Sequence, residues 1–186
     1  MRSLVAGLFS VASLVLLVAA HAVEPGPQVG EKFTPPLEAF DQTGRQHNLE
    51  TLMGERGVVL FFVRSADWCP FCMRQLADVN QRLADFEALG LNVASVSVDK
   101  IALIAKFAKA QSIGYTMLAD PDGTINLSLG IRDEQYPVGS AQFGVPHPIL
   151  YVIDRSGTIR LRYMEPTYRT RPDLSAVLRD AAALKL

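Results

Sequence analysis

The chain has 186 residues, a formal net charge of −1, and 49% hydrophobic and 20% charged residues. This is the composition of an ordinary globular protein, and the length suits one domain with one substantial core. The nearly balanced charge, with no cluster of Lys and Arg, argues against a nucleic acid partner, because neutralising phosphates requires such a cluster.

The first 22 residues have the pattern of a secretory signal peptide. Arg2 is followed by an uncharged run from Leu4 to Ala20 and by the small residues around His21. We therefore expect cleavage after Ala22, which leaves a single domain of residues 23–186, without a membrane span, exported to a bacterial periplasm or secreted. The alternative is a retained membrane anchor, since the apolar run is near the shortest length that spans a bilayer.

The first part of the mature chain predicts an extended lead-in, a hairpin and a buried strand. Residues 23–36 are rich in Pro and Gly, and residues 37–40 and 46–49 flank a turn-forming group from Asp41 to Gly44. The continuous apolar run 58–63 is typical of a strand that is buried on both faces of a sheet. We expect this strand to be central.

The next segment alternates helix and strand. Apolar residues at helical spacing predict a helix over 71–88, ended by Gly90. Residues 91–98 form a second apolar run, and the pattern from Ile101 to Phe107 predicts a second helix. Strand, helix, strand and helix in this order imply parallel strand pairing.

The last third combines short elements with one long irregular stretch. Residues 115–118 suggest a short strand and 124–129 a short helix at best, whereas 130–147, with several Pro and Gly, predicts a surface loop that borders a site. A hairpin signal and an amphipathic helix close the chain: 149–153 with 158–163, then 172–184.

Both cysteines of the chain lie in the sequence Trp68-Cys69-Pro70-Phe71-Cys72. A disulfide across two residues closes a loop too small to stabilise the fold much, so its value is chemical. If a helix begins at Pro70, its free N–H groups and dipole lower the pKa of Cys69 from about 8.5. Cys72 then lies on the same helical face, which makes Cys69 the nucleophile and Cys72 the resolving cysteine.

Two other interpretations of the pair are half of a zinc site and an inert structural disulfide. A zinc site would need further ligands, and only His47 and His147 remain in the mature chain, at unrelated spacings. We therefore expect no metal and no bound cofactor.

For several residues near the pair, a role in the site and a purely structural role are both open. Trp68 either lines the site or fills the core, and Asp67 either influences proton transfer or is a solvated loop acid. Arg64 is a candidate for stabilising a thiolate or binding an anionic substrate, with a surface salt bridge as the alternative. Residues 168–171 form a short basic patch, interpreted as solvated rather than as a partner contact.

With these elements in order, the chain resembles the thioredoxin-fold superfamily, and most closely its alkyl hydroperoxide reductase/thiol-specific antioxidant (redoxin) branch. The resemblance spans residues 29–163. Its motifs are Val29-Gly30-Glu31-Lys32-Phe33, the 41–49 hairpin, Phe61-Phe62, Ala66-Asp67-Trp68-Cys69-Pro70-Phe71-Cys72, Asp120-Pro121-Asp122-Gly123, and His147-Pro148 before Ile149-Leu150-Tyr151-Val152-Ile153-Asp154. It implies a three-layer α/β fold with a central mixed sheet, helices on both faces and an N-terminal β-hairpin extension.

The resemblance also assigns residues to the substrate groove. In thioredoxin-like proteins a cis-proline packs beside the reactive disulfide, and Pro148 best fits that place, with Pro146 a weaker candidate. Such a bond leaves the preceding backbone free to pair with an extended substrate. His147 would then have a conformational role or assist proton transfer.

The sequence departs from this family at positions that matter for chemistry. Peroxidatic enzymes of the branch carry Pro-x-x-x-Thr-x-x-Cys and a later Arg, whereas Phe62, Ala66 and Pro148 stand at those positions. Val63 replaces the buried Asp of thioredoxin, so Cys72 must lose its proton to another group or to water.

The sequence therefore favours an exported thiol-disulfide oxidoreductase that exchanges electrons with a disulfide- or thiol-containing protein substrate and an upstream thiol reductant. The alternative is a peroxiredoxin-like thiol peroxidase, in which Cys69 becomes a sulfenic acid that Cys72 resolves. A third hypothesis is a non-catalytic binding module with a permanent disulfide.

Overall fold

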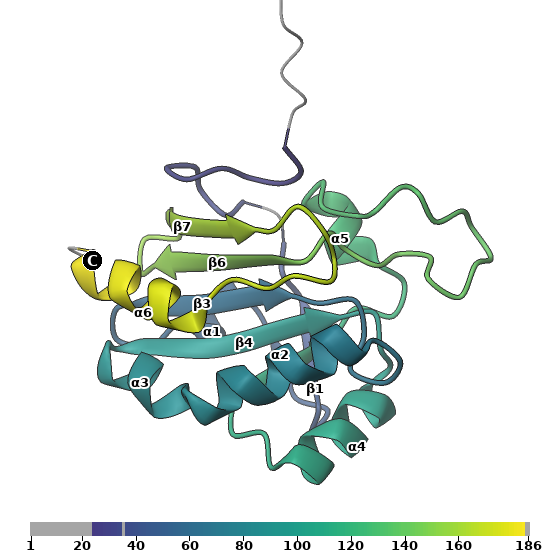
Figure 1. The fold of residues 1–186 in the computed structure, drawn as a ribbon, viewed down its shortest axis with the longest axis horizontal. Coiled ribbons are helices and arrows are strands. Elements are labelled where there is room, and N and C mark those ends of the chain that lie inside the picture. Colours follow the sequence, from purple (N-terminus) through teal and green to yellow (C-terminus); the bar gives the residue numbers. More distant parts are fainter. Residues whose placement is uncertain (1–23, 35, 185–186) are drawn as a thin grey trace, which may run out of the picture.

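The computed structural model describes residues 24–34 and 36–184, which form three layers around one mixed β-sheet (Figure 1). The seven strands are ordered β2-β1-β5-β4-β3-β6-β7 across the sheet. Their bounds are β1 Ala39–Asp41, β2 Gln46–His47, β3 Gly57–Phe62, β4 Leu91–Ser97, β5 Thr116–Ala119, β6 Ile149–Asp154 and β7 Ile159–Met164.

Strand β3 lies near the middle of the sheet because its side chains are apolar on both faces. It pairs in parallel with β4 and antiparallel with β6, and all six of its residues are buried. Val59 and Phe61 belong to the core on one face, and Val58, Leu60 and Phe62 to the core on the other. The predicted central strand is thus confirmed.

Helices cover both faces of the sheet. Residues of α2 (Pro70–Gln81), α3 (Leu83–Ala88), α4 (Ile101–Gln111) and α6 (Leu174–Ala183) pack into the core that includes Val59. Residues of α1 (Leu49–Leu52) and α5 (Thr124–Ser128) pack into the opposite core. The four helices of the first group lie on the near side of the sheet in Figure 1.

One edge of the sheet collects the segments that build the site. The parallel strands β3 and β4 both end there, and the register Phe62–Ile149 and Ile149–Met164 places the start of β6 and the end of β7 at the same edge. Loop residues 63–69, residues 98–100 and the segment that follows β7 are therefore brought together. This convergence follows from the strand directions alone.

Most predicted elements are present, with three local differences. The predicted helix 71–88 begins one residue earlier and is divided at Arg82, whose backbone leaves helical geometry, into α2 and α3. Residue 49, predicted as the end of a hairpin strand, instead begins α1, because Asn48 and Thr51 make a capping box. The N-terminal hairpin joins the main sheet, since β1 pairs antiparallel with β5.

The proposed signal peptide, residues 1–22, lies outside the described residues, so its cleavage and the export of the protein stay predictions. Among the residues that are described, no helix is both long and apolar enough to cross a membrane.

Candidate active site

Cys69 lies at the first turn of a helix, as the sequence predicted. Strand β3 ends at Phe62, and α2 begins at Pro70, which occupies the first helical position where a missing N–H costs nothing. Cys69 is the residue that caps this helix, and its carbonyl oxygen accepts a hydrogen bond from the Met73 N–H at 2.9 Å. The cysteine therefore stands between the central strand and the helix that packs on it.

A buried carboxylate holds the loop that leads to Cys69. Asp99, which is 3% exposed, accepts hydrogen bonds from the Ser65 hydroxyl at 2.7 Å and the Ala66 N–H at 2.6 Å. The Ser97 hydroxyl donates to the same carboxylate at 2.8 Å. Ser65 in turn accepts from the backbone N–H groups of Asp67 and Trp68. The course of the loop is thus fixed from β4, a feature that the sequence analysis missed.

The two cysteines are free and buried, and their side chains are joined by a hydrogen bond. The hydrogen bond from Cys69 lowers the pKa of Cys72 to about 6, against burial, and the backbone N–H of Ser65 and the charge of Arg171 add to the lowering. The same hydrogen bond, together with burial, raises the pKa of Cys69. This reverses the expectation that the helix N-terminus lowers the pKa of Cys69. The pair therefore loses its first proton more easily than an ordinary thiol, and the nearby Arg171 favours the negative charge on Cys72.

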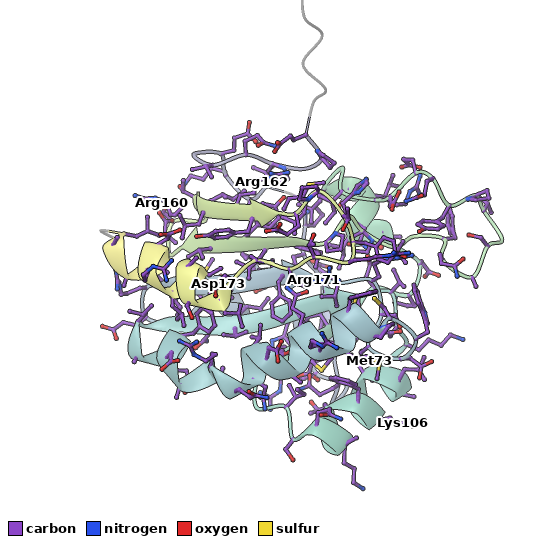
Figure 2. The ribbon with its side chains drawn as sticks, viewed as in Figure 1. Met73, Lys106, Arg160, Arg162, Arg171 and Asp173 are labelled. Carbon is purple, nitrogen blue, oxygen red and sulfur yellow. The ribbon has the colours of Figure 1, made fainter. Side chains whose placement is uncertain are left out.

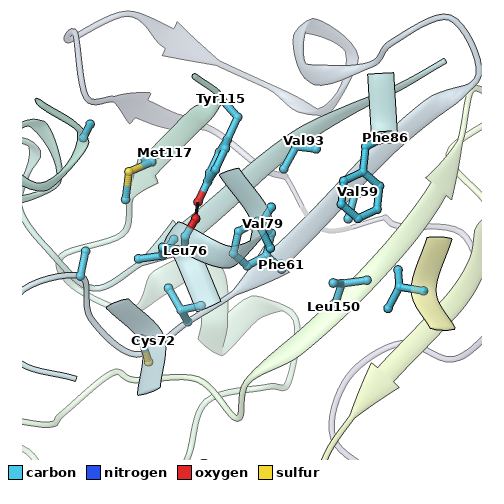
Figure 3. Close-up of a cluster of buried hydrophobic side chains, with 14 of the residues drawn as sticks. Val59, Phe61, Cys72, Leu76, Val79, Phe86, Val93, Tyr115, Met117 and Leu150 are labelled. Atoms are coloured by element: carbon cyan, nitrogen blue, oxygen red, sulfur yellow. Dashed lines mark hydrogen bonds between the residues drawn. The ribbon is translucent and has the colours of Figure 1, made fainter. Parts of the chain in front are cut away.

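Arg171 is the second functional residue that the sequence did not single out. It lies on the segment between β7 and α6, beside α2 (Figure 2), and its Nη2 donates to the Cys72 Sγ at 3.2 Å. The interpretation of residues 168–171 as a solvated patch is therefore wrong for Arg171. Figure 3 shows Cys72 at the margin of the buried cluster that includes Leu76 and Val79.

Cys69, but not Cys72, lines a cavity of about 510 Å³. One wall comes from the loop and the first turn of α2, and the other from the 130–147 loop and the segment after β7. The lining residues are Arg64, Trp68, Cys69, Pro70, Phe71, Tyr136, Gln142 and Tyr168. The prediction that the long loop borders a site is confirmed by Tyr136 and Gln142.

Arg64 lies in this cavity among aromatic rings. Its guanidinium carbon is 4.4 Å from the ring centre of Tyr168, 5.1 Å from that of Tyr136 and 5.3 Å from that of Trp68. Its Nη2 donates to the Tyr136 hydroxyl at 2.9 Å, and its Nε is buried without a hydrogen-bond partner. These partners are aromatic rings and a hydroxyl group, so the interpretation of Arg64 as part of a surface salt bridge is wrong. A buried positive charge is available next to Cys69.

The other residues around the tetrad divide between the cavity and the solvent. Trp68 is 40% exposed, which excludes the core-filling interpretation. Phe71 packs edge-on against Tyr168, with ring centres 6.1 Å apart. Asp67 is exposed beside the cavity and is not among its lining residues, which fits a solvated loop acid.

Pro148 and His147 do not form the predicted groove. The described residues contain no cis peptide bond, so the expectation for Pro148 and its weaker alternative Pro146 is wrong. The His147 N–H donates to the Ile131 carbonyl at 2.7 Å, so this backbone is not free to pair with a substrate. The His147 side chain lines a different cavity, of about 930 Å³, which shares no lining residue with that of Cys69.

Within residues 24–34 and 36–184, no group of three or more His, Cys, Asp or Glu side chains is placed to hold a metal ion. The chemistry that the described site supports is that of two sulfurs, two arginines and a cavity.

We expect the reduced protein to become more stable as the pH rises from about 6 to about 9. The folded state releases the Cys72 proton near pH 6, whereas the unfolded thiol keeps it up to its ordinary value of 9.0, so the unfolded state binds more protons in this window. This gain in the free energy of unfolding is lost as the pH falls through 6. Denaturant unfolding of the reduced protein at several pH values checks this. Cys72→Ser should remove the rise, and equal slopes in both proteins would contradict the assignment.

The chain is similar in sequence to known proteins. The sequence profile of the AhpC/TSA family matches residues 29–162. A Mycobacterium tuberculosis protein that carries a peroxiredoxin name is 32% identical over 130 residues, which cover 70% of this chain and 80% of that protein. Peroxiredoxin Bcp of Escherichia coli is 28% identical over 131 residues, with the same coverage of 70% and 80%.

Solved structures agree on the fold. Peroxidoxin BcpB of Mycobacterium tuberculosis superposes with a TM-score of 0.70 at 22% identity, covering 89% of this chain and all of that one. A cysteine variant of peroxiredoxin 6 of Arenicola marina superposes with a TM-score of 0.75 at 23% identity, covering 87% and 74% of the two chains. The thioredoxin-like fold implied by the sequence is confirmed. The family profile and the sequence relatives support the activity of a thiol-dependent oxidoreductase. The chain belongs to the AhpC/TSA family.

Proposed function

We propose that the protein is a two-cysteine thiol peroxidase that reduces hydroperoxides with Cys69 and Cys72. The observation that carries the proposal is the match, over about 130 residues, to relatives named as peroxiredoxins. The sequence alone favoured exchange with protein disulfides and kept peroxidase activity as its alternative. The relatives support that alternative better, and the cavity at Cys69 supplies a place for a small substrate.

The first step oxidises Cys69. The reduced pair rests as a Cys69 thiol and a Cys72 thiolate, and transfer of the Cys69 proton to Cys72 leaves the thiolate on the sulfur that faces the cavity. This thiolate attacks one peroxide oxygen, so that an S–O bond forms and the O–O bond breaks. The leaving oxygen takes up a proton to give water or an alcohol, and Cys69 becomes a sulfenic acid.

The second step joins the two cysteines. The Cys72 sulfur, three residues along the same helix, attacks the Cys69 sulfur, so that an S–S bond forms and the S–O bond breaks. The departing hydroxide leaves as water with the proton that Cys72 gives up. A thiol reductant then returns the disulfide to the dithiol. No bound cofactor enters these steps.

Two arginines bring positive charge to the cysteine pair, where this chain lacks the polar and basic residues of the family motif. Phe62, Ala66 and Pro148 stand where peroxidatic relatives have Pro, Thr and Arg. Arg64 brings a positive charge to the cavity from the loop after β3, and Arg171 brings one to Cys72 from the segment after β7. The Arg64 charge lines the cavity and can stabilise the negative charge that develops on the leaving oxygen, whereas the Arg171 charge stabilises a thiolate in the pair.

A second candidate function is thiol-disulfide exchange with protein substrates. The observation that favours it is the two-residue spacing of the cysteines at a helix N-terminus, with the exposed Trp68 beside them. The same dithiol then passes electrons to or from a protein partner, in a direction set by reduction potentials. Export by the N-terminal segment, to a periplasm or outside the cell, is part of both candidate functions.

The test is a peroxide-consumption assay with dithiothreitol as the reductant. The protein without residues 1–22 is mixed with hydrogen peroxide or tert-butyl hydroperoxide, and peroxide loss is followed with catalytic amounts of protein. The proposal predicts many turnovers and one intramolecular disulfide per molecule oxidised, seen by mass spectrometry. Loss of peroxide no faster than with a free thiol, together with reduction of insulin disulfides, would instead favour the second candidate.

We expect Arg64→Leu to lower the rate constant of Cys69 oxidation by peroxide about 30- to 150-fold. The substitution removes the buried charge that faces the cavity, and one such group contributes roughly 2–3 kcal/mol to a charged transition state. The rate is measured by rapid mixing of the reduced variant with peroxide. Arg132→Leu, which removes a charge paired with Glu134 outside the Cys69 cavity, is the matched control. An unchanged rate in Arg64→Leu would show that this charge has no part in the reaction.

A further inference from the structure

Arg171 directs most of its hydrogen-bonding groups at α2 and at its own segment, and none of the partners is an acid. Its Nε donates to the Gln75 Oε1 at 2.5 Å, and its Nη1 donates to the carbonyl oxygens of Tyr168 and Thr170 at 2.5 and 2.6 Å. The remaining nitrogen, Nη2, donates to the Cys72 Sγ at 3.2 Å. Three hydrogen bonds from Nε and Nη1 thus hold the guanidinium in place, and its remaining nitrogen points at the sulfur.

The surroundings of Cys72 make this contact the main source of positive charge there. Cys72 is fully buried, and the groups that act on its ionisation are Cys69, the backbone N–H groups of Arg64 and Ser65, and Arg171. Gln75, which is 6% exposed and one helical turn further along α2, holds the arginine in place. A thiolate at Cys72 accepts a charge-assisted hydrogen bond that a sulfur in a disulfide does not.

We infer that Arg171 stabilises the reduced form of the pair as a Cys69 thiol and a Cys72 thiolate, and so makes the disulfide easier to reduce. This inference rests on the dithiol-disulfide cycle of the proposed function. The half-reaction takes two electrons and one proton: the S–S bond breaks, the proton binds Cys69, and the negative charge on Cys72 meets the Arg171 guanidinium. Because the contact gains strength only on reduction, it raises the reduction potential.

The consequence concerns the electron donor. A disulfide with a raised reduction potential accepts electrons from weaker reductants, so the contact widens the range of thiol donors that can recycle the pair. Such a thiol attacks one sulfur of the pair to give a mixed disulfide, and a second thiol molecule releases the reduced protein and forms the oxidised donor. Cys69 lines the cavity and Cys72 does not, so the Cys69 sulfur is the one attacked.

The experiment is a redox titration of the protein in glutathione buffers of graded ratio. The reduced fraction is measured by alkylation and mass spectrometry for the unaltered protein, Arg171→Met and Arg171→Lys. Removing the charge-assisted contact should lower the equilibrium constant for reduction about tenfold in Arg171→Met, equivalent to about 30 mV, and less in Arg171→Lys. Arg179→Met, which removes an exposed charge from the neighbouring helix α6, should leave the constant unchanged.

Equal constants in Arg171→Met and the unaltered protein would overturn the inference. So would an equal fall in Arg179→Met, because that would show a general effect of charge. If Arg171→Met does not fold, Arg171→Lys decides by comparison with the unaltered protein: a lower equilibrium constant together with a thiolate absorbance that appears at higher pH supports the inference, and no change in either overturns it. Failure of the proposed function is distinct, since the disulfide would then not form on mixing with peroxide.

Discussion

Cys69→Ser should lower peroxide consumption by at least about a thousandfold, because it removes the sulfur that faces the cavity and attacks the peroxide. A serine hydroxyl in the same place stays protonated and does not form a sulfenic acid. The buried Cys72 thiolate does not replace it, since Cys72 is fully buried and does not line the cavity. The rate is measured as peroxide loss in the presence of dithiothreitol.

Cys72→Ser separates the two steps of the same reaction. Cys69 keeps its place at the cavity, so one equivalent of peroxide should still oxidise it, and the sulfenic acid should be trapped by dimedone. The disulfide should be absent. The rate of this first step should also fall, because the Cys72 thiolate that accepts the Cys69 proton is gone. If the two substitutions had exchanged effects, with the sulfenic acid found on Cys72, the assignment of roles would be wrong.

Asp99→Asn should lower the free energy of unfolding by about 2–4 kcal/mol and slow the oxidation of Cys69. The carboxylate accepts three hydrogen bonds from Ser65, Ala66 and Ser97, and an amide presents a donor to one of these donors. Leaving buried hydrogen-bonding groups unmatched has a cost of this size. Denaturant unfolding gives the stability, and the loop that carries Cys69 should become more accessible to amide hydrogen exchange.

Asp67→Asn is the matched control for Asp99. Asp67 is exposed and lies on the same loop, so the same chemical change there should leave stability and rate within a small factor. If Asp99→Asn behaved like Asp67→Asn, the carboxylate would have no role in positioning the loop. If it lost stability with no change in the oxidation rate or in exchange at residues 65–68, its role would be confined to the fold.

The part of the site that the sequence predicted is the part built from local contacts. Cys69, Pro70 and Cys72 lie within one turn of a helix, so spacing alone places them. The apolar run that became β3 and the helical periodicity beyond it are also local signals. They are sufficient to indicate a strand followed by a helix with the cysteines at the junction.

The missed residues reach the site from far along the chain. Asp99 is 34 residues from Ser65, and Arg171 is 99 residues from Cys72. The position of Asp99 near the Cys69 loop could have been predicted from the topology, because the parallel strands β3 and β4 end at the same edge of the sheet and Asp99 follows β4 closely. Arg171 depends on the path of an irregular segment after β7, for which periodicity has no signal.

The wrong expectations arose where one physical effect was considered without its competitor. The helix N-terminus favours a thiolate on Cys69, but the hydrogen bond to Cys72 and the burial of both sulfurs outweigh it. The prediction of a cis-proline at 148 came from the thioredoxin-like resemblance, and the structure instead uses the His147 N–H in a contact with Ile131.

The most direct test of the account is the fluorescence of Trp68, the only tryptophan, after rapid mixing of the reduced protein with hydrogen peroxide. Trp68 is next to Cys69 and lines its cavity, so its emission should change as the sulfur is oxidised. The account predicts a fast, peroxide-dependent change that Cys69→Ser abolishes and that is followed by a second phase absent in Cys72→Ser. A change no faster than the oxidation of a free thiol would contradict the assignment of hydroperoxides as the substrate.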